Sequence, residues 1–383
     1  MPRIVLVYFD AGGGHRAAAS ALAEAIREER LPWQVDLLNL QELLDSLDIV
    51  RRFTGIRIQD VYNKMLRNDW TLGSPQLMRV LQWTMRVFHR PTVRRLERHW
   101  RETRPDLVAS LVPHFNRALC ESLAKSRPGS PFVTILTDFA DYPPHFWIER
   151  QSQFLICGSD HAVAQARDMG HPEEHIFRTS GMILNQRFYR YAAVDRRRER
   201  EKLGLDPERL TGLVLFGGQG SRKKMLAIDE RLGQSALPVQ LIFLCGKNER
   251  LAAELLARKS PVPRVVEGFT TNVPYYMQLA DFFIGKPGPG SIAEAMAMHL
   301  PVIVERNAWT LPQERYNTVW VREKEVGLVV ASFAQIGEAV AQLIEPENFL
   351  HFRAHTAAMK NQALFEIPGI LRRILSAAGN AGN

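Results

Sequence analysis

Three glycine-rich turns are the first candidates for chemistry. Each follows an apolar run that predicts a β-strand and precedes a stretch with helical spacing of apolar residues. Glycine lets the backbone approach a phosphate closely, and the helix N-terminus that follows offers free N–H groups with a partial positive charge. A single such turn is usually only a tight connection, but three at equivalent strand ends favour phosphate binding. The turns are Gly12-Gly13-Gly14-His15, Gly217-Gly218-Gln219-Gly220-Ser221 and Gly285-Lys286-Pro287-Gly288-Pro289-Gly290-Ser291.

The spacing within these turns argues against two common classes of nucleotide-binding protein. None of them matches GxxxxGK[ST], so a Walker-type NTPase is not indicated. None has the GxGxxG spacing with an acidic residue about 20 positions later, so a dinucleotide-dependent dehydrogenase is only weakly supported.

The third turn carries the most chemical detail. Ser291 is expected to cap the next helix, and Glu294 lies near the start of that helix. A carboxylate there suits the two vicinal hydroxyls of a ribose whose diphosphate sits on the helix N-terminus; the alternative is an ordinary first-turn acid favoured by the helix dipole. A further set of polar residues follows the next predicted strand and suits sugar hydroxyls: Gln313, Glu314 and Asn317.

The elements that must position these residues alternate between strands and helices, which predicts an α/β fold with two doubly wound, Rossmann-like domains. In the first half, strands are predicted at 4–9, 35–40, 107–112, 132–137 and 154–157. In the second half, they are predicted at 212–216, 239–245, 264–266, 282–285, 301–304 and 327–330. We expect domains at 1–190 and 205–345, a helical segment at 346–383 that packs across them, and an active site in the cleft between the two domains.

Composition narrows the class of protein. The 383 residues carry a net charge of +8. Thirteen basic against four acidic residues within 51–104 account for all of this charge, so the chain is a near-neutral scaffold with one basic insertion. No apolar run approaches the roughly 18 residues of a membrane span, and the N-terminus does not have the pattern of a signal peptide. Three widely spaced cysteines argue against disulfides and a zinc site, and fit a reducing cytoplasm.

Several motifs together resemble glycosyltransferase family 28. The segment 268–304, GFTTNVPYYMQLADFFIGKPGPGSIAEAMAMHLPVIV, followed by PQERYN, is similar to the donor half of that family. The N-terminal DAGGGHRAAA resembles the loop of its monogalactosyldiacylglycerol synthases, and the peptidoglycan-precursor N-acetylglucosaminyltransferase is a more distant likeness. TDFADYPPHFW, SGMI and CGKN occur in the order of the family.

The resemblance implies a GT-B architecture with a UDP-sugar, UDP-galactose or UDP-glucose, as donor and no permanently bound cofactor. By the same resemblance, Phe269 lies beside the uracil and Glu294 holds the ribose. The diphosphate then falls to Gly288, Gly290 and Ser291. Lys286 and the glycines Gly217, Gly218 and Gly220 are further candidates for binding the donor. Gln313, Glu314 and Asn317 face the donor sugar.

An inverting transfer needs a base that takes the proton of the acceptor hydroxyl. His15 in the GGGH turn is the first candidate, because an unperturbed histidine pKa of about 6.5 suits a base near neutrality. Asp138 and His145 are second candidates, either as the base or as the group that orients it. Helix N-termini can stabilise the leaving diphosphate, and no metal-spaced cluster is evident, so no essential metal is expected.

The basic insertion is interpreted as an amphipathic, membrane-binding helix in the acceptor domain. Arg79, Arg86 and Arg90 lie on one stripe, and Trp83 is suited to a bilayer interface. Together with Gly12, Gly13 and Gly14, these residues are expected to serve the acceptor or the membrane. The alternative is that the apolar side packs on the domain and the arginines form a solvated face.

The resulting hypothesis is a peripheral enzyme on the cytoplasmic face of the cell membrane that transfers a hexose to diacylglycerol or a related lipid. A second enzyme hypothesis keeps the fold but has a soluble or other lipid-linked acceptor, or sugar-nucleotide epimerase chemistry. A nucleic-acid-binding protein is the non-enzyme alternative. It is disfavoured because no aromatic stacking pattern accompanies the basic residues and because it leaves the glycine turns unexplained.

Overall fold

The computed structural model describes residues 1–10, 14–44 and 85–381. These residues form two units, each built on a six-stranded, fully parallel sheet. The first unit comprises the described residues up to Gln186 together with Asn361 onward, and the second comprises residues 187–360. The predicted α/β class with two doubly wound sheets is confirmed.

In the first unit the strand order is β2-β1-β3-β4-β5-β6. The chain moves outward in both directions from β1 and β3, so these two neighbours mark the topological switch point, where open α/β sheets bind ligands. The strands are β1 (Arg3–Tyr8), β2 (Gln34–Asn39), β3 (Leu107–Ser110), β4 (Phe132–Ile135), β5 (Phe154–Cys157) and β6 (Ile176–Arg178). The sequence prediction found all of them except β6, which has only three residues.

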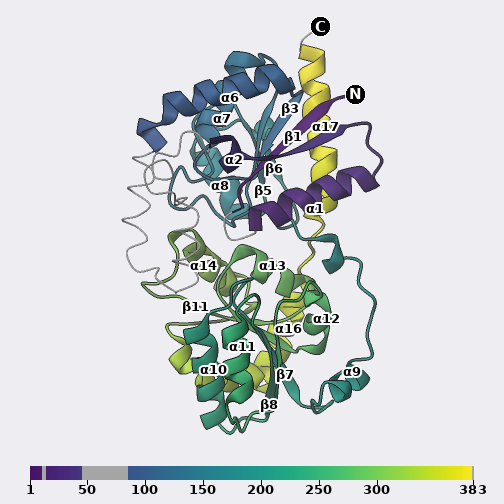
Figure 1. The fold of residues 1–383 in the computed structure, drawn as a ribbon, viewed down its shortest axis with the longest axis vertical. Coiled ribbons are helices and arrows are strands. Elements are labelled where there is room, and N and C mark those ends of the chain that lie inside the picture. Colours follow the sequence, from purple (N-terminus) through teal and green to yellow (C-terminus); the bar gives the residue numbers. More distant parts are fainter. Residues whose placement is uncertain (11–13, 45–84, 382–383) are drawn as a thin grey trace. The chain divides into compact units, whose positions relative to one another are not determined.

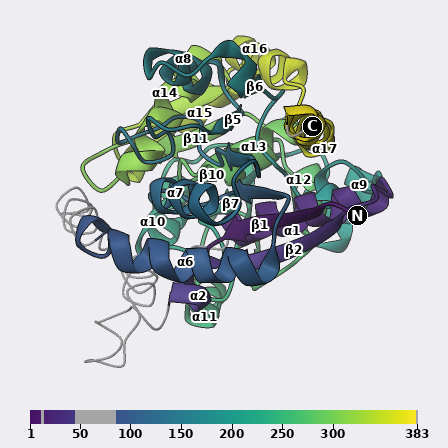
Figure 2. The ribbon, with the colours of Figure 1, turned by 90° about the horizontal axis from the view of Figure 1, so that it is seen from above.

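Alternation along β1 distributes its side chains to two cores, as expected for a strand covered on both faces. Ile4 and Leu6 pack under α1 (Gly14–Glu28) and α17 (Ala363–Ala381), which lie side by side although they come from opposite ends of the chain (Figure 1). Val5 and Val7 pack on the other face, where α6 and α7 lie together (Figure 2). The helices of that face are α2 (Leu40–Leu44), α6 (His89–Thr103) and α7 (Asn116–Ser126); α8 (Asp160–Asp168) follows β5.

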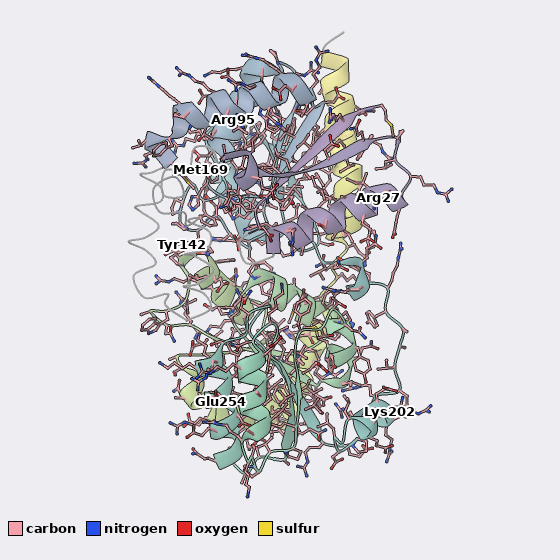
Figure 3. The ribbon with its side chains drawn as sticks, in the orientation of Figure 1. Arg27, Arg95, Tyr142, Met169, Lys202 and Glu254 are labelled. Carbon is pink, nitrogen blue, oxygen red and sulfur yellow. The ribbon has the colours of Figure 1, made fainter. Side chains whose placement is uncertain are left out.

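Helix α6 is the described part of the basic insertion, and its two faces differ sharply. Val93, Leu96 and Trp100 are buried in the core of the first unit. The opposite face presents arginines at one-turn intervals to solvent, while Arg95 lies at the half-buried edge (Figure 3). The apolar face of α6 is therefore used for packing, and its arginines remain exposed. Trp83, on the apolar side of the predicted membrane-binding helix, lies outside the described residues. The exposed set on α6 is Arg90, Arg94, Arg98 and Arg101, and the exposed Arg86 precedes the helix.

In the second unit the strand order is β12-β11-β10-β7-β8-β9, with the switch point between β10 and β7. The strands are β7 (Leu210–Leu215), β8 (Val239–Leu244), β9 (Arg264–Glu267), β10 (Phe282–Gly285), β11 (Val302–Glu305) and β12 (Gly327–Val330). The helices are α9 (Arg196–Lys202), α10 (Arg222–Gln234), α11 (Glu249–Ala257), α12 (Val273–Leu279), α13 (Pro289–Ala297), α14 (Arg315–Glu323), α15 (Ile336–Ile344) and α16 (Pro346–Ala358). All six strands were predicted to within two residues.

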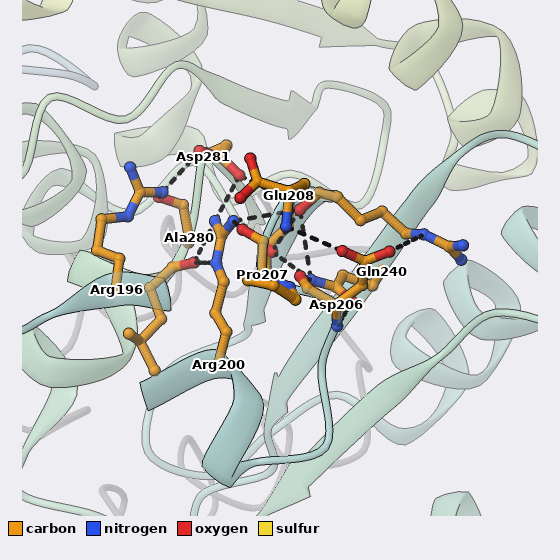
Figure 4. Close-up of polar contacts among 11 residues, drawn as sticks. Arg196, Arg200, Asp206, Pro207, Glu208, Gln240, Ala280 and Asp281 are labelled. Atoms are coloured by element: carbon orange, nitrogen blue, oxygen red, sulfur yellow. Dashed lines mark hydrogen bonds and ion pairs between the residues drawn. The ribbon is translucent and has the colours of Figure 1, made fainter. Parts of the chain in front are cut away.

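Helix α9 consists of seven charged residues and contains no apolar side chain. Asp195 caps it by accepting a hydrogen bond from the Arg198 N–H. Arg200 is buried and its Nη2 lies 2.6 Å from Oδ2 of Asp281, which also receives Arg196 at 2.6 Å (Figure 4). The guanidinium of Arg200 further donates to the Leu279 and Pro207 carbonyls. A buried ion pair thus fastens this charged helix to the start of β10.

Among the described residues, no helix combines the length and the hydropathy needed to cross a lipid bilayer.

Candidate active site

His15 lies at the switch point of the first unit, as the second residue of α1. Its Nδ1 is 3.1 Å from Oγ1 of Thr137, just beyond β4, and its ring centroid is 5.9 Å from that of Trp147. Gly14 starts the helix, whereas Gly12 and Gly13 of the same predicted turn lie outside the described residues.

The pKa of His15 differs from the sequence-based expectation. Burial lowers it from 6.5 to about 4, and a hydrogen bond with the Leu111 backbone only partly offsets this effect. The imidazole is therefore neutral at pH 7, with one nitrogen as donor and the other as acceptor. The expected unperturbed pKa was wrong, because the half-buried ring lies against Thr137, just beyond β4, and Trp147, in the loop that follows.

The structure places Asp138 close to the histidine through a shared neighbour. Its Oδ2 accepts a hydrogen bond of 2.9 Å from Nε1 of Trp147, the same side chain that contacts His15. Asp138 is 6% exposed. Trp147 and Thr137 were not predicted as site residues, since neither has a motif of its own.

His145 is placed differently from the other two catalytic candidates. It is exposed, and its backbone N–H donates to the carboxylate of Asp141. Asp141 also accepts the Trp147 and Ile148 N–H groups, so this carboxylate organises the loop. Burial raises the pKa of Asp141, and these backbone hydrogen bonds act in the opposite direction.

His114 is a half-buried histidine in the segment that follows β3, and no sequence motif marks it. Burial lowers its pKa to about 4, and its ring contacts Phe146 at 4.2 Å. Among the described residues, its Nε2 has no hydrogen-bond partner. A buried ring nitrogen without a partner is costly unless a ligand or water satisfies it. It therefore marks a polar contact point beside β3.

In the second unit, the turn between β10 and α13 lies at the switch point. Gly288 is the N-cap of α13 and Pro289 occupies its first turn, which suits proline. Ser291 was expected to cap this helix, but the helix begins before it, so that prediction was wrong. Helix geometry leaves the N–H groups of Gly290 and Ser291 without intrahelical acceptors, and a side chain at position 290 would meet open space.

Lys286 adds a positive charge to this turn. Its Nζ is 3.0 Å from Oε1 of Glu314, which is 7% exposed. Asn317 is fully buried and donates through Nδ2 to the Pro287 carbonyl at 2.7 Å, fixing the turn. Gln313 lies beside Glu314 in the short 3₁₀ helix Pro312–Glu314. The structure thus joins the predicted diphosphate turn to the predicted sugar-contacting residues.

Glu294 lies in the second turn of α13. Desolvation raises its pKa from 4.5 to about 7, and the charge of Arg187 acts in the opposite direction. A carboxyl group with this pKa is only partly charged near neutrality, so it repels a neighbouring diphosphate less than an ordinary glutamate does. It keeps the oxygens that two ribose hydroxyls need.

The turn after β7 packs against the turn after β8. Lys247 donates its N–H to the Gly218 carbonyl at 2.9 Å. A Cβ at Gly220 would lie 2.7 Å from the Cys245 carbonyl oxygen, so Gly220 is explained by this close approach. Gly217, by contrast, lies beside Lys286 and Gly218 has open space around it. Phe269 follows β9 and is 58% exposed, with Nζ of Lys247 5.4 Å from its ring centroid.

Two family models match the chain. Residues 15–182 match Monogalactosyldiacylglycerol (MGDG) synthase, and residues 212–363 match the glycosyltransferase family 28 C-terminal domain. His15, Asp138 and His145 fall in the first match. The β10–α13 turn, Glu294 and the Gln313–Asn317 segment fall in the second.

Curated relatives agree with these matches. Monogalactosyldiacylglycerol synthase of Spinacia oleracea is 27% identical over 90% of this chain, which spans 66% of that relative's length. A probable monogalactosyldiacylglycerol synthase 3 of Oryza sativa subsp. japonica is 26% identical over 95% of this chain and 73% of its own length.

Solved structures share the fold at low identity. MurG of Acinetobacter baumannii superposes with a TM-score of 0.62 at 12% identity, covering 97% of this chain and all of that one. The UDP-GlcNAc 2-epimerase of Neisseria meningitidis, bound to UDP-GlcNAc, gives 0.62 at 14% identity, covering 98% and 100%. The fold is that of GT-B glycosyltransferases. The two family matches divide the chain between them: residues 15–182 are similar to monogalactosyldiacylglycerol synthases, and residues 212–363 are similar to the C-terminal domain of glycosyltransferase family 28.

Proposed function

We propose that the protein transfers a hexose from a UDP-sugar to the free hydroxyl of diacylglycerol, with inversion at the anomeric carbon. The observation that carries the proposal is the β10–α13 turn. Two free amides at a helix N-terminus, a lysine and a near-neutral carboxyl group are assembled there on buried supports. The amides and the lysine suit the diphosphate of a sugar nucleotide, and the carboxyl group suits its ribose hydroxyls.

Residues of the second unit bind each part of the donor: the uracil, the ribose, the diphosphate and the hexose. Phe269 and its backbone flank the uracil, and Glu294 accepts the ribose hydroxyls. The amides of Gly290 and Ser291 hold the diphosphate, and the ammonium group of Lys286 lies beside them. Gln313 and Glu314 accept or donate hydrogen bonds to the hexose. The carboxylate of Glu314 also keeps Lys286 in place, since the two are already paired.

In the first unit, His15 is the base. Its acceptor nitrogen takes the hydroxyl proton of the lipid while that oxygen attacks the anomeric carbon and the bond to the diphosphate breaks. UDP leaves with the electron pair. The negative charge that develops on it is stabilised by the α13 N-terminus and Lys286, which are fixed before reaction. Asp138 acts as a positioning residue through Trp147.

The acceptor is inferred from the relatives. The spinach and rice proteins are named for monogalactosyldiacylglycerol, which is diacylglycerol carrying one galactose. The buried, unpartnered Nε2 of His114 offers a polar contact to the glycerol portion of such a lipid. UDP-galactose is therefore the favoured donor and UDP-glucose the alternative, and the chemistry of His15 is the same for both.

The decisive experiment incubates the protein with UDP-galactose, UDP-glucose or UDP-GlcNAc and vesicles containing diacylglycerol, and identifies products by mass. A hexosyl-diacylglycerol from one UDP-hexose is expected. Glu294→Ala should weaken UDP binding, whereas Glu249→Ala, which removes an exposed carboxylate from the first turn of α11, should not. Conversion of the UDP-sugar without acceptor would indicate an epimerase instead, and no lipid product with any donor would refute the acceptor assignment.

We further propose that α6 holds the protein on an anionic membrane surface. On α6, Arg90, Arg94 and Arg98 are exposed, so their charges face solvent. Each basic residue near an anionic leaflet contributes on the order of 1 kcal/mol. Reversing Arg90, Arg94 and Arg98 to glutamate should therefore weaken binding to phosphatidylserine-containing vesicles by roughly a hundredfold or more, as measured by co-sedimentation. Arg79 and Trp83, predicted for the same role, lie outside the described residues.

A matched control separates this surface from net charge alone. Reversing Arg250, Arg258 and Lys259, all exposed on or after α11, makes the same change in total charge in the second unit. This variant should keep most of the vesicle binding. Equal losses in the two triple variants would show that net charge, and not α6, controls the association.

A further inference from the structure

Outside the proposed transfer site, the fold assembles three metal-binding side chains that the sequence separates. Glu325 lies in the turn between α14 and β12, and His351 and His355 lie one helical turn apart on α16. No metal-spaced cluster is evident in the sequence, because the glutamate is far from the histidines along the chain. All three side chains are partly exposed, at 56%, 48% and 37% respectively, so an ion can reach them.

The distances among these groups fit a single small ion. Oε2 of Glu325 lies 3.5 Å from Nε2 of His351 and 3.5 Å from Nδ1 of His355. One donor atom from each residue lies within 4.8 Å of the others. Two ligands held at about 2.0–2.1 Å from zinc with tetrahedral angles are separated by roughly 3.3–3.4 Å. The carboxylate and the His351 ring thus already have nearly the spacing of two zinc ligands.

The His355 ring also has the hydrogen bond that commonly orients a metal-binding histidine. Its Nδ1 is 3.1 Å from the Lys324 carbonyl oxygen. In many metal sites the nitrogen that does not ligate donates to a backbone carbonyl, which fixes the ring and its tautomer. With Nδ1 as the donor to Lys324, Nε2 of His355 is the nitrogen left to bind an ion. The 3.5 Å between Nδ1 and Glu325 then shows that the ring lies beside the carboxylate, and it is not a spacing between two ligand atoms. The rings of His351 and His355 are 4.3 Å apart, so both can face one ion.

We propose that Glu325, His351 and His355 bind one zinc ion, with water completing the coordination. Two imidazoles and one carboxylate are ligands that suit zinc, whereas calcium and magnesium prefer sets made of oxygens alone. The ion fastens α16 to the turn before β12. Since α16 also packs on α13 and α15, this link stabilises the end of the second unit. The role is structural, and the proposed transfer does not depend on it.

The test is a zinc titration of tag-free protein, followed by desalting and measurement of bound metal, with cobalt absorbance as a second readout. We expect one zinc per chain and a rise in the unfolding temperature on zinc addition. His351→Ala and His355→Ala should each weaken binding by at least about tenfold, and the double variant should lose the bound ion and the temperature shift together.

Two controls keep the result specific. Leu350→Ala changes an exposed residue of α16 directly before His351. His161→Ala removes an exposed histidine of α8. Both should bind zinc as the unmodified protein does. The proposal is overturned if the unmodified protein retains no zinc, or if the double variant retains as much. Either result is independent of the transfer assay, so failure here leaves the proposed activity untouched.

Discussion

His15→Ala should lower kcat by about 10²–10⁴-fold, the usual contribution of a general base, while UDP binding stays within about a factor of two. The reason is that the ring takes a proton from the acceptor in the first unit, whereas UDP is held by residues of the second. Steady-state kinetics on vesicles and calorimetric UDP titration separate the two quantities. His161→Ala, an exposed histidine on α8, is the matched control and should retain the unmodified rate.

The pH profile of the same reaction gives a sharper test. Burial lowers the pKa of His15 to about 4, so the basic form persists as the pH falls through 6.5 and is lost only near 4. With the UDP-sugar saturating, so that the ionisation of Glu294 does not limit donor binding, the acid limb of kcat should therefore lie near pH 4. Thr137→Val removes the hydroxyl 3.1 Å from Nδ1 and should reduce the rate less than His15→Ala. An acid limb at 6.5, or an active His15→Ala variant, would exclude His15 as the base.

Asp281→Asn should lower the free energy of unfolding by about 3–5 kcal/mol, because it leaves the buried guanidinium of Arg200 without its counter-charge. The carboxylate of Asp281 lies 2.6 Å from Nη2 of Arg200 and also accepts the Thr211 N–H at 2.8 Å. The side chain of Arg200 is only 6% exposed, so water replaces little of the lost interaction. Urea unfolding followed by circular dichroism gives the value.

Comparison variants distinguish burial from ion pairing itself. Arg222 and Glu254 form a more exposed pair at 2.7 Å, and Glu254→Gln should lower the unfolding free energy by at most about 1 kcal/mol. In a double-mutant cycle, Arg200→Met with Asp281→Asn should be less destabilising than the sum of the two single changes. If Asp281→Asn costs no more than Glu254→Gln, the Arg200 pair does not anchor α9.

The success and failure of the sequence predictions follow the range of the interactions involved. Strands 282–285 and 327–330 were predicted with the observed bounds, because an apolar run ended by a turn is a local signal. Strand β6 has three residues, two of them half-buried and one exposed, too few for a pattern. Helix α9 has no apolar residue, and its anchor is Asp281, far along the chain.

The candidate site shows the same division. The turn containing Lys286 and Gly288 was placed at a strand end from local spacing, as was the segment of Glu314 and Asn317. Their role in donor binding stays a prediction. The cap at Ser291 was misassigned because Pro289 is compatible with the first turn and lets the helix begin earlier. The Trp147 ring that joins His15 to Asp138 has no motif of its own, so only the structure reveals it.

The sequence by itself determined where strands meet turns, and therefore which glycines, histidines and carboxylates stand at the carboxyl ends of the two sheets. That information is local: periodicity, glycine and proline act within a few residues. Only the tertiary structure decided the charge states of the buried side chains and which distant residues they contact. Desolvation of His15 and Glu294, the burial of Arg200 against Asp281, and the approach of Glu325 to His351 depend on groups distant in the chain. The local sequence pattern does not predict such neighbours, because burial and ion pairing arise only when the sheets and helices pack.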